Sequence, residues 1–296
     1  MAVGLTLLAT GSPAPLNHRG GSSYLVTIDD DVLLVDCGPA CVRRLLQHGV
    51  SLTRISTLLL THLHYDHCVD YPYLVLTRWD QGVGSIDDLN VYGPAGTRAM
   101  TDRFFADDGA FCHDLAARTE HEGSQFIYEK RGGVLPRRRP APIVNEVASG
   151  STLDGPGWHL EVAEVLHCQP YLICLGYRLE AQGKSIVFGG DSAPIESLTR
   201  LARGADVLLH MCHFVNGLET DPRITSCCSG HRDAAQTAKA AGVDTLVLVH
   251  ITEQVEQPGV SERVLHEVGE IFDGRVIFGQ DLLDVPIADM QTINLR

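Results

Sequence analysis

One short segment holds the residues with the clearest capacity for chemistry. Four side chains within residues 61–67 can bind metal ions: His62, His64, Asp66 and His67. The segment directly follows the apolar run 55–60, which predicts a buried strand, so it lies where the chain leaves the end of a sheet. Imidazole and carboxylate ligands together suit Zn²⁺ and neighbouring first-row transition metals. A polar loop that is histidine-rich by chance is disfavoured, because both the spacing and the preceding strand match a metal motif.

Three further candidates each follow a predicted strand: His167 after 160–166, Asp191 after 185–188, and His250 after 245–249. Each is weak alone, since an isolated histidine is more often a hydrogen-bonded structural residue. Together with the motif they make seven ligands, enough for two metal ions with one shared carboxylate and open positions for water. The sequence therefore predicts two Zn²⁺ ions per chain, with Mn²⁺ or Fe²⁺ as alternatives.

The predicted elements explain how distant residues meet. Strands at 4–10, 23–28 and 32–35 precede a helix at 40–48, and strand–helix alternation continues to the end of the chain. The ends of strands in open α/β sheets present ligands. Asp36, at the end of its strand, is equally a site candidate and a turn-forming residue. We expect one domain over 1–296, with halves near 1–150 and 151–296 and a lid or insertion at 106–145.

Charge and composition narrow the partners. The chain has 23 Lys and Arg against 37 Asp and Glu, a net charge of −14, which argues against a surface built for nucleic acid phosphates. The basic run 137–139 is expected to be a solvated loop. The start of the chain lacks a basic segment typical of a signal peptide, and no apolar run is long enough to span a membrane. We therefore expect no membrane association and a cytoplasmic location.

The nine cysteines are scattered and odd in number, which fits unpaired thiols in a reducing compartment. Cys68 and Cys168 each follow a candidate ligand, but neither belongs to a Cys-x-x-Cys pair. We expect both to be core residues or neighbours of ligands rather than ligands themselves.

The chain resembles the metallo-β-lactamase-fold hydrolases, and within them the ribonuclease Z and arylsulfatase group. The matching segments run through nearly the whole chain: 11–13, 19–25, 35–38, 62–67, 92–94, 167, 176–178, 190–191, 230–231 and 248–251. The resemblance implies an α/β fold, an αββα sandwich of two mixed β-sheets flanked by helices. It also implies that His62, His64, His167 and Asp191 bind one metal ion, while Asp66, His67, His250 and the bridging Asp191 bind the other.

The same resemblance implies catalytic roles. Asp66 would orient a metal-bridging hydroxide, and His231 matches a non-ligand histidine that protonates the leaving group. The alternative for His231 is a solvent-facing residue at a helix N-terminus. Where the nuclease has a His-Glu-Ala-Thr-like segment, this chain has Met211 in place of the glutamate, so we expect the acid relay of the nuclease to be absent.

These departures and the negative net charge favour a small, aromatic substrate over tRNA. The sequence also shows no long Gly/Pro-rich arm of the kind that would bind tRNA. The substrate pocket would use Tyr65, His213 and Asn216. An apolar wall could come from Tyr65, Trp79 and Phe214, although each of these aromatic residues could equally be part of the core. We predict a binuclear zinc-dependent hydrolase of an ester, lactone, sulfate, phosphodiester or activated aryl halide, and, from the resemblance, a homodimer. The alternatives are a ribonuclease Z-like tRNA 3′-processing endonuclease and a metal-dependent redox or sensing protein.

Overall fold

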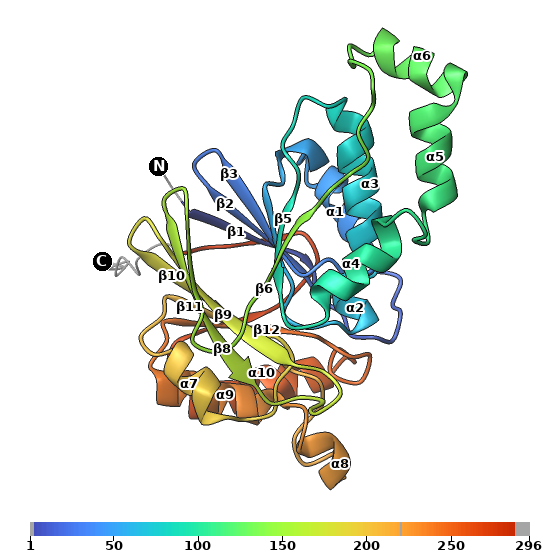
Figure 1. The fold of residues 1–296 in the computed structure, drawn as a ribbon. Coiled ribbons are helices and arrows are strands. Elements are labelled where there is room, and N and C mark those ends of the chain that lie inside the picture. Colours follow the sequence, from blue (N-terminus) through green and yellow to red (C-terminus); the bar gives the residue numbers. More distant parts are fainter. Residues whose placement is uncertain (1–2, 220, 288–296) are drawn as a thin grey trace.

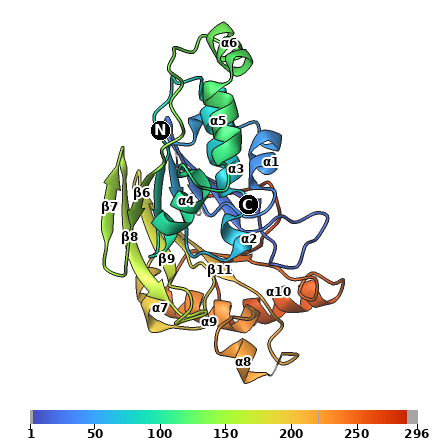
Figure 2. The same ribbon diagram turned by 45° about the vertical axis from the view of Figure 1, so that its right-hand side comes forward.

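A computed structural model describes residues 3–219 and 221–287. Two seven-stranded sheets face each other between outer layers of helices (Figures 1 and 2). The first sheet has the order β14-β1-β2-β3-β4-β5-β6. Its strands are β1 (Val3–Ala9), β2 (Ser23–Ile28), β3 (Asp31–Val35), β4 (Thr57–Leu59), β5 (Asn90–Gly93), β6 (Ile143–Glu146) and β14 (Leu283–Val285).

The second sheet has the order β13-β12-β11-β10-β9-β8-β7. Its strands are β7 (Thr152–Gly155), β8 (Trp158–Val165), β9 (Cys174–Ala181), β10 (Lys184–Phe188), β11 (Val207–Met211), β12 (Thr245–Val249) and β13 (Arg275–Phe278). Both sheets are mixed. The pairs from β3 to β6 and from β10 to β13 are parallel, and the other pairs are antiparallel.

The helices form the outer layers. They are α1 (Cys41–Gln47), α2 (Tyr65–Cys68), α3 (Tyr71–Gly82), α4 (Thr97–Phe105), α5 (Cys112–Glu120), α6 (Glu122–Lys130), α7 (Glu196–Leu201), α8 (Pro222–Thr225), α9 (His231–Ala241) and α10 (Val260–Ile271), with a 3₁₀ turn η1 (Leu52–Arg54). Helices α1 and α3 cover the first sheet, and α7, α9 and α10 cover the second (Figure 1). The αββα sandwich of two mixed sheets is confirmed. In the described part of the chain, no helix is long and apolar enough to cross a membrane.

The core between the sheets joins both halves of the chain. Leu7, Val35 and Leu59 of the first sheet pack in one buried cluster with Phe188 and Val247 of the second. Alternating strand residues reach this shared core, while their neighbours pack under the outer helices. The first sheet takes its strands from residues 3–146 and the second from residues 152–278, and only β14 crosses back. Apart from β14, the strands of the two sheets thus divide between residues 146 and 152.

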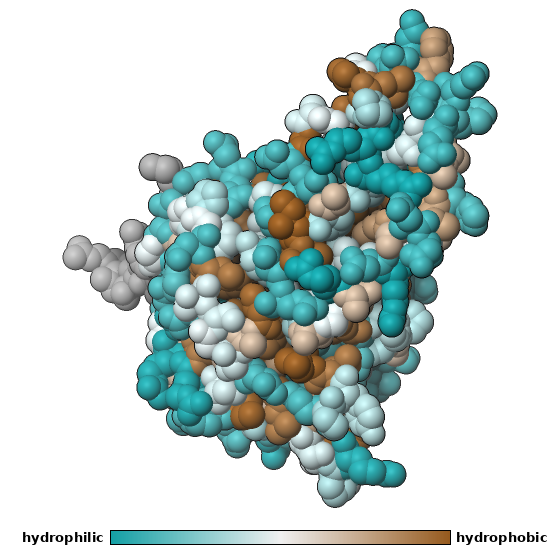
Figure 3. Space-filling model, in the orientation of Figure 1, coloured by the Kyte–Doolittle hydropathy of each residue, from teal (hydrophilic) through white to brown (hydrophobic). Residues whose placement is uncertain are grey.

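The segment 106–145 forms a projecting arm. Helices α5 and α6 pack on each other and lead back through an extended stretch to β6, and both views show them pointing away from α2 (Figures 1 and 2). In this conformation the arm does not cover the helix that carries the metal motif. Its surface is mostly hydrophilic, with apolar side chains near the outer end (Figure 3); Phe126, Ile127 and Val134 are exposed there.

The expectation that residues 137–139 form a solvated basic run is wrong for Arg137, whose side chain is buried at the base of the arm. Its guanidinium lies 3.9 Å from the ring centre of Trp79 and 4.7 Å from that of Tyr128, and it donates to Asp80 over 2.8 Å. A flat, weakly hydrated guanidinium stacks on aromatic rings, so it can be buried where an ammonium could not. Trp79 thus belongs to the arm base and not to a wall beside the metal motif.

We expect Arg137→Ala to destabilise the protein by about 2 kcal/mol, because it removes two cation–π contacts and leaves Asp80 with fewer donors. Thermal unfolding followed by circular dichroism measures this, and Arg138→Ala, at the exposed neighbouring position, is the matched control. Equal, small shifts in both variants would mean that Arg137 does not anchor the arm.

Candidate metal centre

All seven predicted ligands come from one edge of the sandwich. Residues 61–67 follow β4 and include α2, while Asp191 follows β10 and His250 follows β12. Strand β8, which precedes His167, runs parallel to β10 because each is antiparallel to β9. The strand ends therefore face the same edge and bring together residues up to 188 positions apart. Gly190 has φ 57° and a Cβ there would lie 2.9 Å from the Leu175 carbonyl oxygen, so this turn needs glycine.

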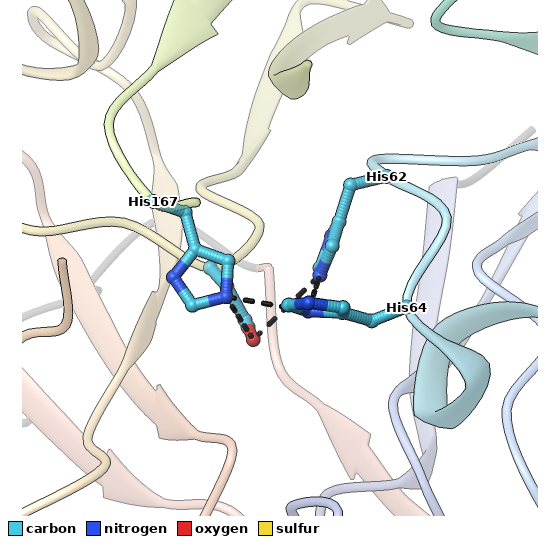
Figure 4. Close-up of side chains that lie close together, drawn as sticks. His62, His64 and His167 are labelled. Atoms are coloured by element: carbon cyan, nitrogen blue, oxygen red, sulfur yellow. Dashed lines mark hydrogen bonds and ion pairs between the residues drawn. The ribbon is translucent and has the colours of Figure 1, made fainter. Parts of the chain in front are cut away.

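Three imidazoles and one carboxylate form a first group, in which the ligand atoms of His62, His64, His167 and Asp191 lie within 4.8 Å of one another. His64 Nδ1 lies 3.0 Å from His62 Nε2 and 3.3 Å from His167 Nε2, and Figure 4 shows the three rings converging from two separate segments. Two nitrogens bound tetrahedrally to Zn²⁺ at 2.0–2.1 Å are about 3.3 Å apart, so this spacing fits a shared cation.

A second group contains Asp66, His67, Asp191 and His250, with ligand atoms again within 4.8 Å of one another. His250 Nε2 lies 3.4 Å from Asp66 Oδ2, and His67 Nε2 lies 3.6 Å from the same oxygen. All four side chains are buried. This donor set of two imidazoles and two carboxylates also suits a first-row divalent ion.

Asp191 belongs to both groups through one atom. Its Oδ2 lies 3.0 Å from His250 Nε2 and 3.4 Å from His67 Nε2 in the second group, and 3.8 Å from the Nε2 atoms of His62 and His167 in the first. A carboxylate oxygen in this position can contact two cations at once. The geometry therefore fits the bridging role that the resemblance implies for Asp191.

Unsatisfied polar atoms test whether the second group fits a metal ion. Both carboxylate oxygens of Asp66, Nε2 of His67 and Nε2 of His250 are buried without a hydrogen-bond partner in the described structure. Leaving such a group buried and unpaired costs about 1–3 kcal/mol, and native proteins rarely tolerate several together. A cation among these four atoms would satisfy all of them, so the residues present fit a metal ion.

Contacts behind the ligands fix the orientation of the rings. Asp36 accepts hydrogen bonds from His67 Nδ1 (2.7 Å), from the Thr61 backbone N–H (2.8 Å) and from Thr61 Oγ1 (2.8 Å). His167 Nδ1 donates to the Cys227 carbonyl oxygen over 2.7 Å. Such partners hold the remote ring nitrogen and leave Nε2 free for a metal ion. Asp36 is therefore an orienting residue, and its φ of 58° shows that it also makes the turn.

Electrostatics differ between the two groups. Burial and the neighbouring His67 lower the pKa of His62 well below its usual value, so this ring is neutral and ready to bind a cation. Burial opposes protonation of His67 and His250 too, but nearby carboxylates prevail. Asp191 and Asp36 raise the pKa of His67, and Asp191 and Asp66 raise that of His250 to about 9. Without metal ions, protons on these two rings balance the carboxylates.

This predicts a pH dependence of the metal-free protein. The His250 pKa is about 9 when folded against 6.5 for the free side chain, so its stabilising contribution is complete below pH 6.5 and is lost as pH rises through 9. We expect the unfolding free energy after chelation to fall by about 3 kcal/mol over this window. Urea unfolding at several pH values measures it.

The control for this measurement is His250→Asn, since Asn tolerates the left-handed backbone of position 250 (φ 57°) and does not titrate. The variant should show a smaller pH slope, with the remainder due to His67. A metal-loaded wild type should lose little stability over the same window, because cations replace the protons. An equal slope in all three proteins would contradict the explanation.

His231 lies at the start of α9 and is fully buried, so the solvent-facing alternative is wrong. Its Nε2 lies 2.6 Å from Glu267 Oε2, and its Nδ1 accepts from the Asn216 backbone N–H over 3.2 Å. Sequence reasoning missed Glu267, which comes from α10 and gives His231 the acidic partner that Met211 cannot provide. In this conformation both ring nitrogens are engaged, so proton donation to a leaving group requires the ring to release one partner.

The expected pocket residues lie in different environments. Tyr65 is 56% exposed beside the ligands, with its hydroxyl on the Pro13 carbonyl, whereas Phe214 is buried against Met211. Asn216 is engaged by Asp233 and by the Arg232 backbone. His213 lies next to the second group, because its Nδ1 is 3.2 Å from His250 Nδ1. Burial and His250 lower the His213 pKa to about 4.

Comparisons with known proteins agree with this geometry. The family model described as "Beta-lactamase superfamily domain" matches residues 32–251. Ribonuclease Z of Mycobacterium bovis (strain BCG / Pasteur 1173P2) is 34% identical over 290 residues, covering 96% of this chain and 98% of the relative. Ribonuclease Z of Mycolicibacterium paratuberculosis (strain ATCC BAA-968 / K-10) is 35% identical over 289 residues, with the same coverages of 96% and 98%.

Solved structures share the fold. The metallo-beta-lactamase fold protein YhfI from Bacillus subtilis superposes with a TM-score of 0.72 at 21% identity, covering 96% of this chain and 98% of that one. Human tRNase Z, short form, superposes with a TM-score of 0.69 at 19% identity, covering 97% and 100%.

Two expectations are wrong. The small-molecule substrate and the exclusion of nucleic acid conflict with full-length similarity to proteins named ribonuclease Z. The net charge of −14 was a poor reason to exclude nucleic acid, because divalent ions, which the composition does not count, can neutralise phosphate locally. The absence of a long Gly/Pro-rich segment for tRNA binding was also a poor reason to exclude tRNA. This chain covers 98% of the length of these relatives, which leaves them no room for a long extra segment.

The fold, the two convergent ligand groups and the full-length relatives lead to one conclusion: the chain belongs to the beta-lactamase superfamily, among its ribonuclease Z homologues, and is a metal-dependent hydrolase.

Proposed function

We propose that this chain is an endoribonuclease that hydrolyses a phosphodiester bond near the 3′ end of precursor tRNA. The observation that carries the proposal is the similarity to ribonuclease Z over 96% of the chain at 34% identity. The site chemistry is compatible with it. Two divalent ions held by the two ligand groups would make hydroxide available near neutral pH and neutralise the charge on the phosphate.

In this proposal the protein's own residues position the reaction. Asp191 Oδ2 fixes the separation of the two ligand groups. Asp66 has two carboxylate oxygens without hydrogen-bond partners, and nearby His250 and His67 prevail over burial to lower its pKa. Asp66 therefore stays ionised at neutral pH and can orient an attacking water by accepting its hydrogen bond. The buried His231 pairs with the partly exposed Glu267 next to Asn216, and we propose His231 as the proton donor after ring rotation.

The test is cleavage of a precursor tRNA with a 3′ trailer by purified, zinc-loaded protein. We expect a tRNA-sized product and a released trailer, and little cleavage of mature tRNA. Asp66→Asn should lower kcat at least about a hundredfold while the fold is kept, since it loses a general-base-type contact. His266→Ala, at an exposed α10 position paired with Glu270, is the control and should keep full activity.

The outcome decides between the candidate functions. Failure of the metal-loaded protein to cleave or bind any RNA, with efficient hydrolysis of a chromogenic aryl ester instead, would overturn the proposal. A precursor tRNA that is cut equally by wild type and Asp66→Asn would point to a contaminating nuclease.

Three finer assignments accompany this proposal. We propose zinc as the native ion, since imidazole and carboxylate donors suit it, and elemental analysis of protein purified without added metal tests this. A cytoplasmic location is supported by the nine cysteines, all of which are free thiols. The homodimer that the resemblance implies stays a prediction, and light scattering of the purified protein tests it.

A further inference from the structure

Next to the first ligand group lies a cluster of thiols that hydrolysis does not use. Cys227 and Cys228 follow α8, and their Sγ atoms are 3.8 Å apart. One ligand atom each from His167, Cys227 and Cys228 lies within 4.8 Å of the others. Cys228 is 7% exposed, while Cys227 is partly exposed and open to an entering ion.

The separation of the two sulfurs has a direct interpretation. Two thiolates bound tetrahedrally to one cation at about 2.3 Å lie roughly 3.8 Å apart, the distance found here. Both backbone N–H groups, of Cys227 and of Cys228, donate to the Ile224 carbonyl, so the turn after α8 holds the two thiols close together. The pair is therefore arranged for a shared ion before any ion binds.

The donors of this cluster differ from those of the hydrolytic site. Two thiols beside one imidazole form a soft donor set, unlike the nitrogen and oxygen donors of the hydrolytic site. Soft sulfur ligands select thiophilic cations, so the two neighbouring sites differ in the ions they favour.

We propose that Cys227 and Cys228, with His167 beside them, form a third cation site for a thiophilic ion, and that its occupancy inhibits the hydrolytic centre. Binding replaces two S–H bonds by two S–metal bonds and releases two protons to solvent, with no change of oxidation state. The link to the centre is His167, whose Nδ1 contacts the Cys227 carbonyl while its Nε2 faces Asp191. A cation that moves this turn moves the carbonyl that holds Nδ1, and with it a proposed ligand of the first group.

The inhibitory part of this inference depends on the proposed function, whereas the binding part does not. The probe is Cd²⁺ added to the zinc-loaded full chain, with thiolate-to-cadmium ultraviolet absorption as the first readout. Cadmium that exchanges into the hydrolytic site meets only nitrogen and oxygen donors and gives no such band. We expect one equivalent to produce the band and to lower RNA cleavage at least about tenfold, with recovery when a dithiol chelator is added.

Variants locate the site. Cys228→Ser and Cys227→Ser should each lose most of the absorption and of the inhibition. Cys112→Ser, which removes a partly exposed thiol on the distant α5, should behave as wild type. If the wild-type protein gave no band, the thiol site would be refuted. A double variant, Cys227→Ser with Cys228→Ser, that kept the band unchanged would refute it as well. The band without loss of cleavage would refute the coupling through His167. If the protein cleaves no RNA, the band still decides the binding part, and that failure belongs to the proposed function.

Discussion

Asp191→Asn is expected to abolish the proposed RNA cleavage, with a fall in kcat of at least about a thousandfold, and to lower the zinc content of the purified protein from the proposed two ions to less than one. The reason is that Asp191 Oδ2 faces the Nε2 atoms of His67 and His250 in one ligand group and of His62 and His167 in the other. An amide oxygen carries no charge, so neither cation keeps its shared anionic ligand.

A comparison with His64→Ala makes this prediction specific. His64 contacts only the first group through Nδ1, so its removal should cost one ion and leave the other. Asp154→Asn, which changes an exposed carboxylate on the same sheet, should keep both ions and full activity. Elemental analysis after dialysis and circular dichroism of each variant provide the measurements. If Asp191→Asn retained both ions, the shared oxygen would not be a bridge.

The sequence indicated the candidate ligands because each follows a strand with a strong local signal. Residues 245–249 form the fully buried β12, and His250 comes directly after it. Parallel strands end at one edge, so the residues that follow them meet without any need to know their partners. A histidine close to a strand end is not always part of the site. His210 lies inside β11, fully buried, whereas His213, three residues further on, reaches the second group.

Contacts that depend on packing between distant elements were not predictable. Glu267 contacts His231 only because α10 packs on α9, and nothing in the segment 261–272 indicates which residue it meets. The Cys227 carbonyl that orients His167 is a backbone group and leaves no pattern in the sequence. Strand β14 has three residues and pairs with β1 across more than 270 positions, so its local signal is slight.

The arm was the least regular part in sequence and contains two helices in the structure. Helices α5 and α6 have nine residues each, and each buries a single side chain, Leu115 or Tyr128, so their apolar periodicity is too sparse to be recognised. Their position depends on the buried Arg137 between Trp79 and Tyr128, a contact that only the folded chain brings together.

Asp36→Asn is the second change with a large expected effect. The Asp36 carboxylate accepts from His67 Nδ1 and twice from Thr61, so it holds the imidazole that faces Asp66 and Asp191. Removing such a partner of a metal ligand typically weakens metal binding by about 10- to 100-fold. Asn is well suited to the left-handed backbone at position 36 (φ 58°), so the variant changes the hydrogen bond and not the turn.

The expected signature of Asp36→Asn is therefore a higher zinc concentration for half-maximal cleavage, with most of kcat restored at saturating zinc. Zinc titration in a metal buffer, followed by cleavage of the precursor tRNA, separates these two quantities. Asp70→Asn, which changes a nearby carboxylate that caps the Val42 N–H and contacts no proposed ligand, is the matched control and should leave zinc affinity unchanged. A kcat that stays low at saturating zinc would mean that Asp36 acts in the reaction itself, because orientation of His67 alone is restored once the ion is bound.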